Sequence, residues 1–490
     1  MTDPSNNPLL WLVALGIFMQ MLDSTIVNTA LPAMAAGLGE SPLRMQSVVI
    51  AYALTMATLI PASGWLSDRF GTRRVFFLAI VLFTLGSMFC AYAQSLGQLA
   101  AARVLQGIGG AMLLPVGRLA LLRSIPRGDF LRAMTFVTIP GLIGPLIGPT
   151  LGGWLVQVAS WHWIFLINLP VGVIAGAATL RFMPDARSEV ARFDVGGYLM
   201  LSFSMIAISL SLDGLSELGL RQATVLMLLL LGMVSFVAYW LHATRTPKPL
   251  FSLGLFGVHT FRVGVLGNLF ARIGTGSMPF LIPLLLQVSL GYSPMQAGMM
   301  MIPVAIAGML SKSLVVPIVR EFGYRRVLIG NTILVGLAMA SFALISADQP
   351  LWLRIIQFAF FGMVNSLQFT AMNTITLRDL DGELASGGNS LLSMVMMLSM
   401  SLGVAAASGL LASFTGVFGS ERGVTALPAF RATFVCVGLV TTVSAWIFWQ
   451  LERDRRPPPR RPSPGGRRSG AAPRRLPIAC GGLAGRAASR

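Results

Sequence analysis

Fourteen long runs of apolar residues dominate the sequence and limit the folds that are open to it. An α-helix of about 20 apolar residues is long enough to cross a lipid bilayer. The runs cover residues 9–33, 46–66, 75–93, 98–120, 133–157, 163–182, 196–213, 221–243, 261–288, 296–319, 327–346, 351–375, 386–412 and 427–450. A chain that is 55% hydrophobic and 11% charged cannot hide this much apolar surface from water, so lipid must be its solvent. The sequence therefore predicts an all-α integral membrane protein with 14 transmembrane helices.

Basic residues alternate between the loops that join these runs. Loops 2–3, 4–5, 6–7, 8–9, 10–11 and 12–13 together hold 16 Arg and Lys, whereas the opposite loops hold only Arg44, Arg221 and Arg422. Arg and Lys are enriched in cytoplasmic loops. The alternation predicts that both termini are cytoplasmic, and it supports the number of spans, because a missed span would disturb it.

An internal repeat divides the chain. The segment Gly64–Val75 has a second, partial copy at Arg320–Val327, and Arg103–Gln106 returns as Arg354–Gln357, each at an offset near 252 residues. Parallel repeats of six helices are a transporter architecture. The predicted domains are given by number: an N-terminal six-helix bundle 1–185, two inserted helices 186–260, a C-terminal six-helix bundle 261–450 and a disordered Arg/Pro-rich cytoplasmic tail 451–490.

The sequence lacks the residue patterns that are characteristic of several other classes of protein. The three cysteines (Cys90, Cys436 and Cys480) have no disulfide or metal-site spacing, and the three histidines form no ligand pair. Gly107–Gly110 follows no strand and precedes no phosphate-binding Lys, so it is not a nucleotide loop. We expect no enzyme, no cofactor and no metal. The formal charge of +18 comes largely from the tail and from loops between spans, which argues against nucleic-acid binding.

Five motifs carry a resemblance to a known family. They are Leu22–Pro32, Gly64–Val75 (with Thr72 where a basic residue is common), Arg103–Gly107, Gly148–Gly153 and Trp161–Pro170. In this order and topology they resemble the fourteen-helix drug:proton antiporters of the major facilitator superfamily, over roughly residues 9–450. The resemblance implies a monomeric secondary transporter of the bacterial inner membrane. Its partners would be protons, the bilayer and small amphipathic substrates or drugs, which it would export by alternating access with the proton gradient as energy source.

Two alternatives remain open from the sequence. The first is a dedicated exporter of an anionic metabolite or metal chelate on the same fold. The second is a membrane sensor or partner protein that does not transport. Dissipating the proton gradient would stop either exporter and leave a sensor unaffected.

Asp23 is the only carboxylate well inside an apolar span, and Arg103 lies in span 4 at a depth from which a long side chain could reach it. A charge inside a membrane must pair, face water or become protonated. The resemblance implies that this position couples transport to protons. We therefore predict that Asp23 and Arg103 form the proton-coupling site; a structural polar contact for Asp23 and snorkelling of Arg103 are the alternatives.

A second cation, Arg272, lies near the middle of span 9, and the repeat offset maps it to Gln20, one turn from Asp23. We predict that Arg272 binds an anionic or polar substrate group or pairs with Asp23. The predicted substrate cavity comprises Gln20, Asn28, Asn268 and Arg272.

Two further segments are predicted to act in the conformational change. The resemblance implies that Asp68 contacts the start of the penultimate span at 385–388 and latches the two halves; the alternative is a solvated salt bridge to Arg69 or Arg73. The predicted latch comprises Gly64, Asp68, Gly71, Arg73 and Arg74. The antiporter motif comprises Gly144, Pro145, Gly148, Pro149, Gly152 and Gly153, where small residues at every fourth position allow close helix packing.

Overall fold

The computed structural model describes residues 7–125, 127–187, 193–214, 222–380, 382–418 and 427–451, and within these ranges all regular secondary structure is helical. Fourteen helical segments of the described residues are long and apolar enough to cross a membrane, which confirms the predicted number. The helices of the first half are α1 (Pro8–Leu38), α2 (Gln46–Phe70), α3 (Thr72–Ala91), α4 (Leu96–Ser124), α5 (Arg127–Val158), α6 (Trp163–Leu166) and α7 (Asn168–Phe182). The next are α8 (Val195–Gly214) and α9 (Gln222–Arg245).

The remaining helices belong to the second half. They are α10 (Gly254–Gly257), α11 (His259–Leu284), α12 (Pro294–Met300), α13 (Ile302–Phe322), α14 (Tyr324–Ser341), α15 (Leu351–Leu377), α16 (Gly382–Phe418), α17 (Leu427–Val443) and α18 (Ala445–Trp449). Two consecutive α-helices join to make one span in three places among the described residues: α6 with α7, α12 with α13, and α17 with α18.

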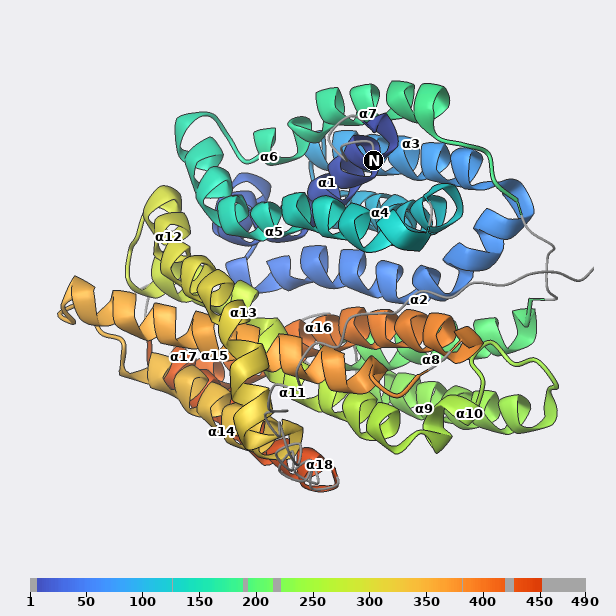
Figure 1. Cartoon of the computed structure of the whole chain (residues 1–490). Helices are drawn as coiled ribbons and strands as arrows, with labels where there is room; N and C mark the ends of the chain where they lie inside the picture. Colours follow the sequence, from blue (N-terminus) through green and yellow to red (C-terminus); the bar gives the residue numbers. More distant parts are fainter. Residues whose placement is uncertain are drawn as a thin grey trace, which may run out of the picture. The chain divides into compact units, whose positions relative to one another are not determined.

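The helices pack in groups that follow the chain order (Figure 1). In the first group, α1 packs against α4, α5 and α7, while α4 also packs against α2 and α3. In the second group, α11 packs against α15, α16 and α17, and α13 packs against α15. The inserted helices α8 and α9 pack against each other, and α8 also contacts α16 and α2. The exact domain limits and the tail remain predictions, since residues 452–490 lie outside the described ranges.

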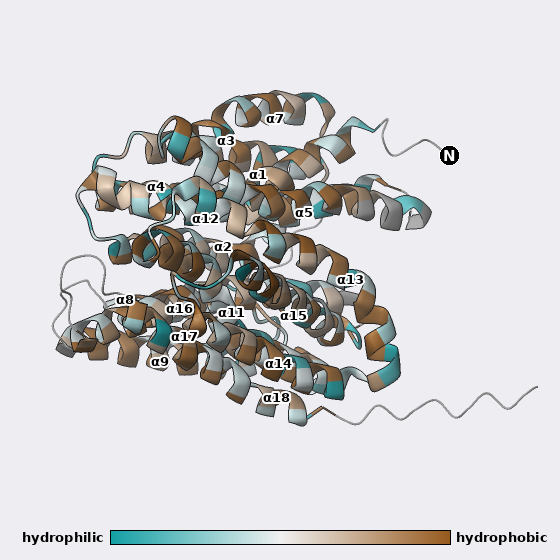
Figure 2. Cartoon of the chain, turned by 90° about the vertical axis from the view of Figure 1, so that its left-hand side faces the viewer, coloured by the Kyte–Doolittle hydropathy of each residue, from teal (hydrophilic) through white to brown (hydrophobic). Residues whose placement is uncertain are grey.

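Apolar residues, brown in Figure 2, run along the helices, and many large apolar side chains of the described residues are exposed. The inserted helix α9 shows this most clearly, because Leu226, Leu230, Val234 and Val237 are each more than half exposed. Their spacing of three and four residues places them on one face. An apolar face of this kind is stable in contact with lipid and not with water, so the two inserted helices are transmembrane elements.

The two halves contact each other directly where α5 ends and α12 begins. A Cβ atom added to Gly153 of α5 would lie 2.2 Å from the Pro294 carbonyl oxygen, and one added to Gly298 of α12 would lie 2.3 Å from the Pro149 carbonyl oxygen. The Thr150 hydroxyl donates to the Gly298 carbonyl at 3.2 Å. Glycine on both helices therefore allows backbone-to-backbone contact between the halves.

The repeat seen in the sequence has a structural counterpart. Gly71 separates α2 from α3 with φ 91° and ψ 145°, and Gly323 separates α13 from α14 with φ 78° and ψ 155°. Both conformations have positive φ, which glycine adopts without the steric cost of a Cβ atom. The same glycine turn thus connects equivalent helices in the two halves.

Candidate functional site

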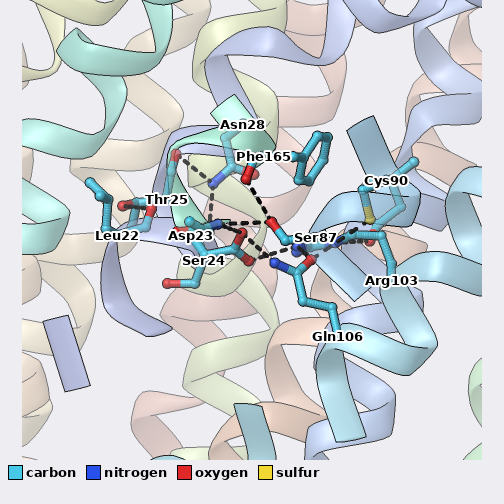
Figure 3. Close-up of polar contacts among 12 residues, drawn as sticks. Leu22, Asp23, Ser24, Thr25, Asn28, Ser87, Cys90, Arg103, Gln106 and Phe165 are labelled. Atoms are coloured by element: carbon cyan, nitrogen blue, oxygen red, sulfur yellow. Dashed lines mark hydrogen bonds and ion pairs between the residues drawn. The ribbon is translucent and has the colours of Figure 1, made fainter. Parts of the chain in front are cut away.

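Asp23 lies in the middle of α1 and is completely buried. Its Oδ2 accepts a hydrogen bond from Arg103 Nη1 at 2.6 Å (Figure 3). Its Oδ1 accepts two more, from Gln106 Nε2 at 2.7 Å and from Asn168 Nδ2 at 3.1 Å. Both carboxylate oxygens are therefore held by donors, as a buried charge requires.

Arg103 lies on α4 and is only 2% exposed. Besides Asp23, its Nη1 donates to Gln106 Oε1 at 2.6 Å, and its Nε donates to the Val48 carbonyl oxygen at 3.3 Å. The guanidinium carbon also stands 4.1 Å from the centroid of the Tyr52 ring, a cation–π distance. Three elements of the first half thus hold the guanidinium: α1, α2 and α4.

Amide and hydroxyl groups extend the network to α3 and α7. Asn168, at the start of α7, also approaches Ser87 Oγ at 3.0 Å. Ser87 on α3 in turn donates to the Phe165 carbonyl oxygen at 2.9 Å. The roles of Gln106, Asn168 and Ser87 were missed by sequence reasoning. The available signals were that Gln106 recurs as Gln357 and that Asn168 lies within the Trp161–Pro170 motif.

The second half has no equivalent ion pair among its described residues. Arg354, the counterpart of Arg103, is 5% exposed and donates from Nη2 to the carbonyl oxygens of Ser346 and Ala347, both at 2.7 Å. Its Nη1 donates to the Tyr292 hydroxyl. The repeat offset places Thr275 where the first half has Asp23. The buried carboxylate is therefore a feature of the first half, and the second copy of the motif has a different set of partners.

The antiporter-motif glycines lie against α1, next to Asp23. A Cβ atom added to Gly144 would lie 2.9 Å from the Leu22 nitrogen, one added to Gly148 would lie 2.2 Å from Thr25 Oγ1, and one added to Gly152 would lie 2.5 Å from the Ile26 carbonyl oxygen. The Thr29 hydroxyl also donates to the Pro149 carbonyl oxygen at 3.2 Å. The spacing thus brings α5 into backbone contact with α1, while Gly153 faces α12 and Pro145 lies within the helix. The role of this seam as a barrier to proton leak remains a prediction.

Two of the residues predicted to form the latch, Asp68 and Arg73, have partners within the first half. Asp68 pairs with Arg123 at the end of α4, and among the described residues it forms no ion pair with Arg69 or Arg73 and no hydrogen bond with residues 385–388. The reason is that α2 packs against α4, which brings a guanidinium within reach of the carboxylate. A flexible cation is a stronger partner for a carboxylate than the partial charge at a helix end.

The rest of this loop contacts the segment that follows α7. The Thr72 hydroxyl donates to the Pro184 carbonyl oxygen at 2.9 Å, and Arg73 Nε donates to the Met183 carbonyl oxygen. A Cβ atom added to Gly71 would lie 2.0 Å from Asp185 Oδ1. Gly64 has open space around it and Arg74 is exposed. A latch between the halves at this loop remains a prediction.

The four residues predicted to line a substrate cavity lie on α1 and α11, which pack against each other. Gln20, Asn28 and Asn268 are buried. Asn28 Nδ2 donates to the Ser24 carbonyl oxygen at 3.2 Å, so one of its groups is used within α1. The predicted pairing of Arg272 with Asp23 is not present, because Arg103 occupies the carboxylate and Arg272 Nε donates instead to Asn268 Oδ1 at 3.3 Å.

The fold and the buried pair together define a helical membrane transporter. The family model of the Major Facilitator Superfamily matches residues 13–404 and 264–486, and the chain belongs to that family. It is a multi-pass membrane transporter of small molecules and not an enzyme.

Known relatives narrow the group further. The chain is 51% identical over 449 residues to the "Putative multidrug resistance protein MdtD" of Serratia proteamaculans, with 91% of this chain and 93% of that protein covered. It is 50% identical over 451 residues to the protein of the same name from Escherichia coli O9:H4, with 91% and 94% covered. These relatives are bacterial, which implies that the chain lies in a bacterial inner membrane.

Solved structures of distant members share the fold. A D-xylose-proton symporter matches with a TM-score of 0.63 at 14% identity, covering 90% of this chain and 97% of that one. A POT family transporter in complex with 5-aminolevulinic acid matches with a TM-score of 0.66 at 16% identity, covering 89% and 94%. At this level of identity the likeness concerns the arrangement of helices alone.

Proposed function

We propose that the chain exports drugs or other amphipathic small molecules from the cytoplasm in exchange for entering protons. The observation that carries the proposal is the buried Asp23 carboxylate, held by Arg103, Gln106 and Asn168 without solvent exposure. Ionisable groups inside a membrane protein are costly and mark ion and proton pathways. The similarity to the MdtD proteins, whose printed name refers to multidrug resistance, supports the drug or amphipath class.

Protonation of Asp23 would change what holds α1 in place. The ionised carboxylate binds donors on α4 and α7 and so ties three helices together. A proton on the carboxylate removes its charge and weakens the hydrogen bond from Arg103. Hydrogen bonds between charged groups are stronger than those between neutral groups, so the loss is large. The guanidinium would then need another partner, and this requirement couples proton binding to movement of α1 relative to α4.

A continuous series of contacts connects this movement to the interface between the halves. α1 lies against α5 along Gly144, Gly148 and Gly152, so the two helices are expected to move together. α5 in turn meets α12 of the second half at Gly153 and Gly298. We infer that protonation at Asp23 alters the α5–α12 contact, and that this contact opens and closes as access alternates. In this scheme the chain acts as a monomer with both termini in the cytoplasm.

The experiment uses the full chain reconstituted in proteoliposomes with an imposed pH gradient. Ethidium, norfloxacin and deoxycholate represent cationic, zwitterionic and anionic amphipaths. The proposal predicts gradient-driven movement of at least one compound, without nucleotide, and its loss when a protonophore collapses the gradient. Movement that persists without the gradient would exclude proton coupling, and no movement of any compound would favour a sensor that does not transport.

A further inference from the structure

Arg272 of α11 is a cation near the middle of a membrane-spanning helix. It lies about 20 Å from the start of the helix at His259, at about 1.5 Å per residue. No Asp or Glu of the described residues forms an ion pair with it, and the buried carboxylate on α1 is already paired with Arg103. A charged group at this depth in a membrane costs free energy unless another group pairs with it.

Two contacts hold the Arg272 side chain in a fixed position and leave most of its donors free. Its Nε donates to Asn268 Oδ1 at 3.3 Å, and its guanidinium carbon stands 4.3 Å from the centroid of the Phe369 ring on α15. Asn268 is itself fixed, because its Nδ2 donates to the Gly264 carbonyl oxygen at 3.0 Å. A guanidinium has five N–H donors in a planar fork, so these contacts orient the fork and use one donor.

One end of the guanidinium is buried and has no hydrogen-bond partner among the described residues. The Arg272 Nη2 atom is inaccessible to solvent and unsatisfied, as are Gln20 Oε1 on α1 and Asn373 Oδ1 on α15. Asn373 lies one turn from Phe369, on the same face of α15. A buried donor left without a partner costs free energy comparable to its desolvation. Since α1 and α15 both pack against α11, the unsatisfied groups belong to neighbouring helices.

We propose that Arg272 is the binding site for the anionic head group of an amphipathic substrate, with Phe369 supporting the guanidinium. A carboxylate, sulfonate or phosphate would satisfy the free donors of the fork in two parallel hydrogen bonds. Gln20 Oε1 and Asn373 Oδ1 are acceptors, so they suit a hydroxyl or N–H donor elsewhere on the substrate and not the anion itself. The inference rests on the proposed export function and names the charge class of its substrates.

The test uses three probes that share an aromatic body and differ in the head group: phenylbutyrate, phenylbutylamine and phenylbutanol. The full chain, purified in detergent and washed free of lipid, is titrated with each probe while its thermal unfolding is followed. The wild type should bind the anionic probe more tightly than the other two. Arg272→Gln should weaken phenylbutyrate binding about tenfold or more, the expected effect of losing a charge-assisted hydrogen bond, with little change for the neutral probe.

Three control variants separate the site from general effects. Lys312→Gln removes another partly buried cation of the second half, on α13, and should leave the preference for phenylbutyrate unchanged. Arg272→Lys should retain part of the preference because it keeps the charge. If Arg272→Gln does not fold, Phe369→Leu removes the aromatic support and should weaken phenylbutyrate binding several-fold.

The proposal would be overturned if the wild type bound all three probes equally or bound none of them. It would also be overturned if Arg272→Gln kept the full preference for the anionic probe. If Arg272→Gln does not fold, the same result in Phe369→Leu would overturn it. A stabilisation that depends on Arg272 and appears with phosphatidylglycerol in place of phenylbutyrate would assign the site to a lipid and would also overturn it. Asp23→Asn should retain the charge preference, so failure of proton coupling and failure of this site give different results.

Discussion

Asp23 and Arg103 balance each other's charge where solvent reaches neither side chain, and the neutral donors around them fill the remaining positions on the carboxylate. The free energy that such a pair contributes becomes evident when the pair is broken. A buried pair often contributes little compared with apolar residues, but removal of one partner leaves an uncompensated buried charge and costs about 3–5 kcal/mol. In the proposed mechanism, protonation of Asp23 is the event that breaks the pair.

The first prediction concerns this pair. Arg103→Met should destabilise the protein by about 3–5 kcal/mol, because Asp23 is left buried without its cation. The double variant Asp23→Asn/Arg103→Met should recover much of that loss. Thermal unfolding in detergent measures both. Arg44→Met, which removes the more exposed partner of Glu40, serves as the control and should change stability by about 1 kcal/mol or less. A double variant no more stable than Arg103→Met would contradict this interpretation.

The second prediction concerns Asp194, which lies just before α8. Burial acts to raise its pKa, but hydrogen bonds from the Gly197 N–H, from His242 and from the Leu250 N–H outweigh burial and hold the pKa below its ordinary value. A depressed folded-state pKa gives stability that is present above the unfolded pKa, about 4, and that is lost as the pH falls through the lower folded value. Asp194→Asn should therefore be less stable than the wild type at neutral pH, and the difference should shrink below about pH 4.

Unfolding midpoints recorded from neutral pH down to acid measure this difference. His242→Gln is the matched control, since it leaves both backbone donors on Asp194 in place. It should therefore retain most of the pH dependence. A difference between Asp194→Asn and wild type that stays constant with pH would show that the carboxylate charge is not responsible.

Residue roles were only partly predictable from the sequence. Asp23 and Arg103 were recognisable because charges are rare in apolar spans, and the structure does bring them together. Asn168 and Ser87 carry no comparable signal, because neutral polar residues are common in membrane helices. The pairing of Asp68 with Arg123 was not predicted for a different reason: the packing of α2 against α4 decides which cation Asp68 meets, and no local pattern gives that packing.

At the scale of helices, α1 and α5 form a close seam near the site, where Gly144, Gly148 and Gly152 of α5 lie against α1. An added Cβ at Gly152 would approach the Ile26 backbone carbonyl, which cannot move without moving α1. The third prediction is that Gly152→Ala lowers stability by about 1–3 kcal/mol through overpacking. Gly330→Ala on α14 is the control, since nothing lies within 4 Å of the added atom.

Thermal unfolding compares the two glycine variants, and the control should be neutral or slightly stabilising because alanine favours helix. Equal stability of the two variants would show that α5 can move away from α1 at no cost. Such freedom would also remove the mechanical connection from Asp23 to the interface between the halves.

The existence of the helices followed from hydropathy, but their limits and interruptions did not. The predicted run 133–157 lies within the longer α5, Arg127–Val158, since polar residues can extend a helix beyond the apolar stretch. The predicted run 163–182 is interrupted at Ile167, where α7 begins with Asn168. That interruption places the Asn168 side chain beside Asp23. Hydropathy predicts the span but not the position of the break.

At the scale of the whole molecule, the halves meet where α5 ends and α12 begins, and the function proposed above requires this contact to separate during transport. The fourth prediction is that Gly298→Leu prevents close contact at this interface, because its side chain would meet the Pro149 carbonyl oxygen. Transport should fall several-fold. A cysteine placed at Thr150, with Cys90, Cys436 and Cys480 replaced by serine, should become more reactive toward an impermeant maleimide.

Gly416→Leu on α16 is the matched control, because nothing lies within 4 Å of an atom added there. It should leave both transport and maleimide reactivity unchanged. Unchanged reactivity at the Thr150 position in Gly298→Leu would mean that the α5–α12 contact is not the part of the molecule that opens.

The most direct test of the account compares two modes of transport by wild type and Asp23→Asn in the same proteoliposomes. One mode is accumulation of a substrate against its gradient, driven by protons, and the other is exchange of labelled for unlabelled substrate at equal concentrations. If Asp23 carries the coupling proton, Asp23→Asn should lose accumulation and retain exchange. Accumulation by Asp23→Asn at the wild-type level would contradict the central claim.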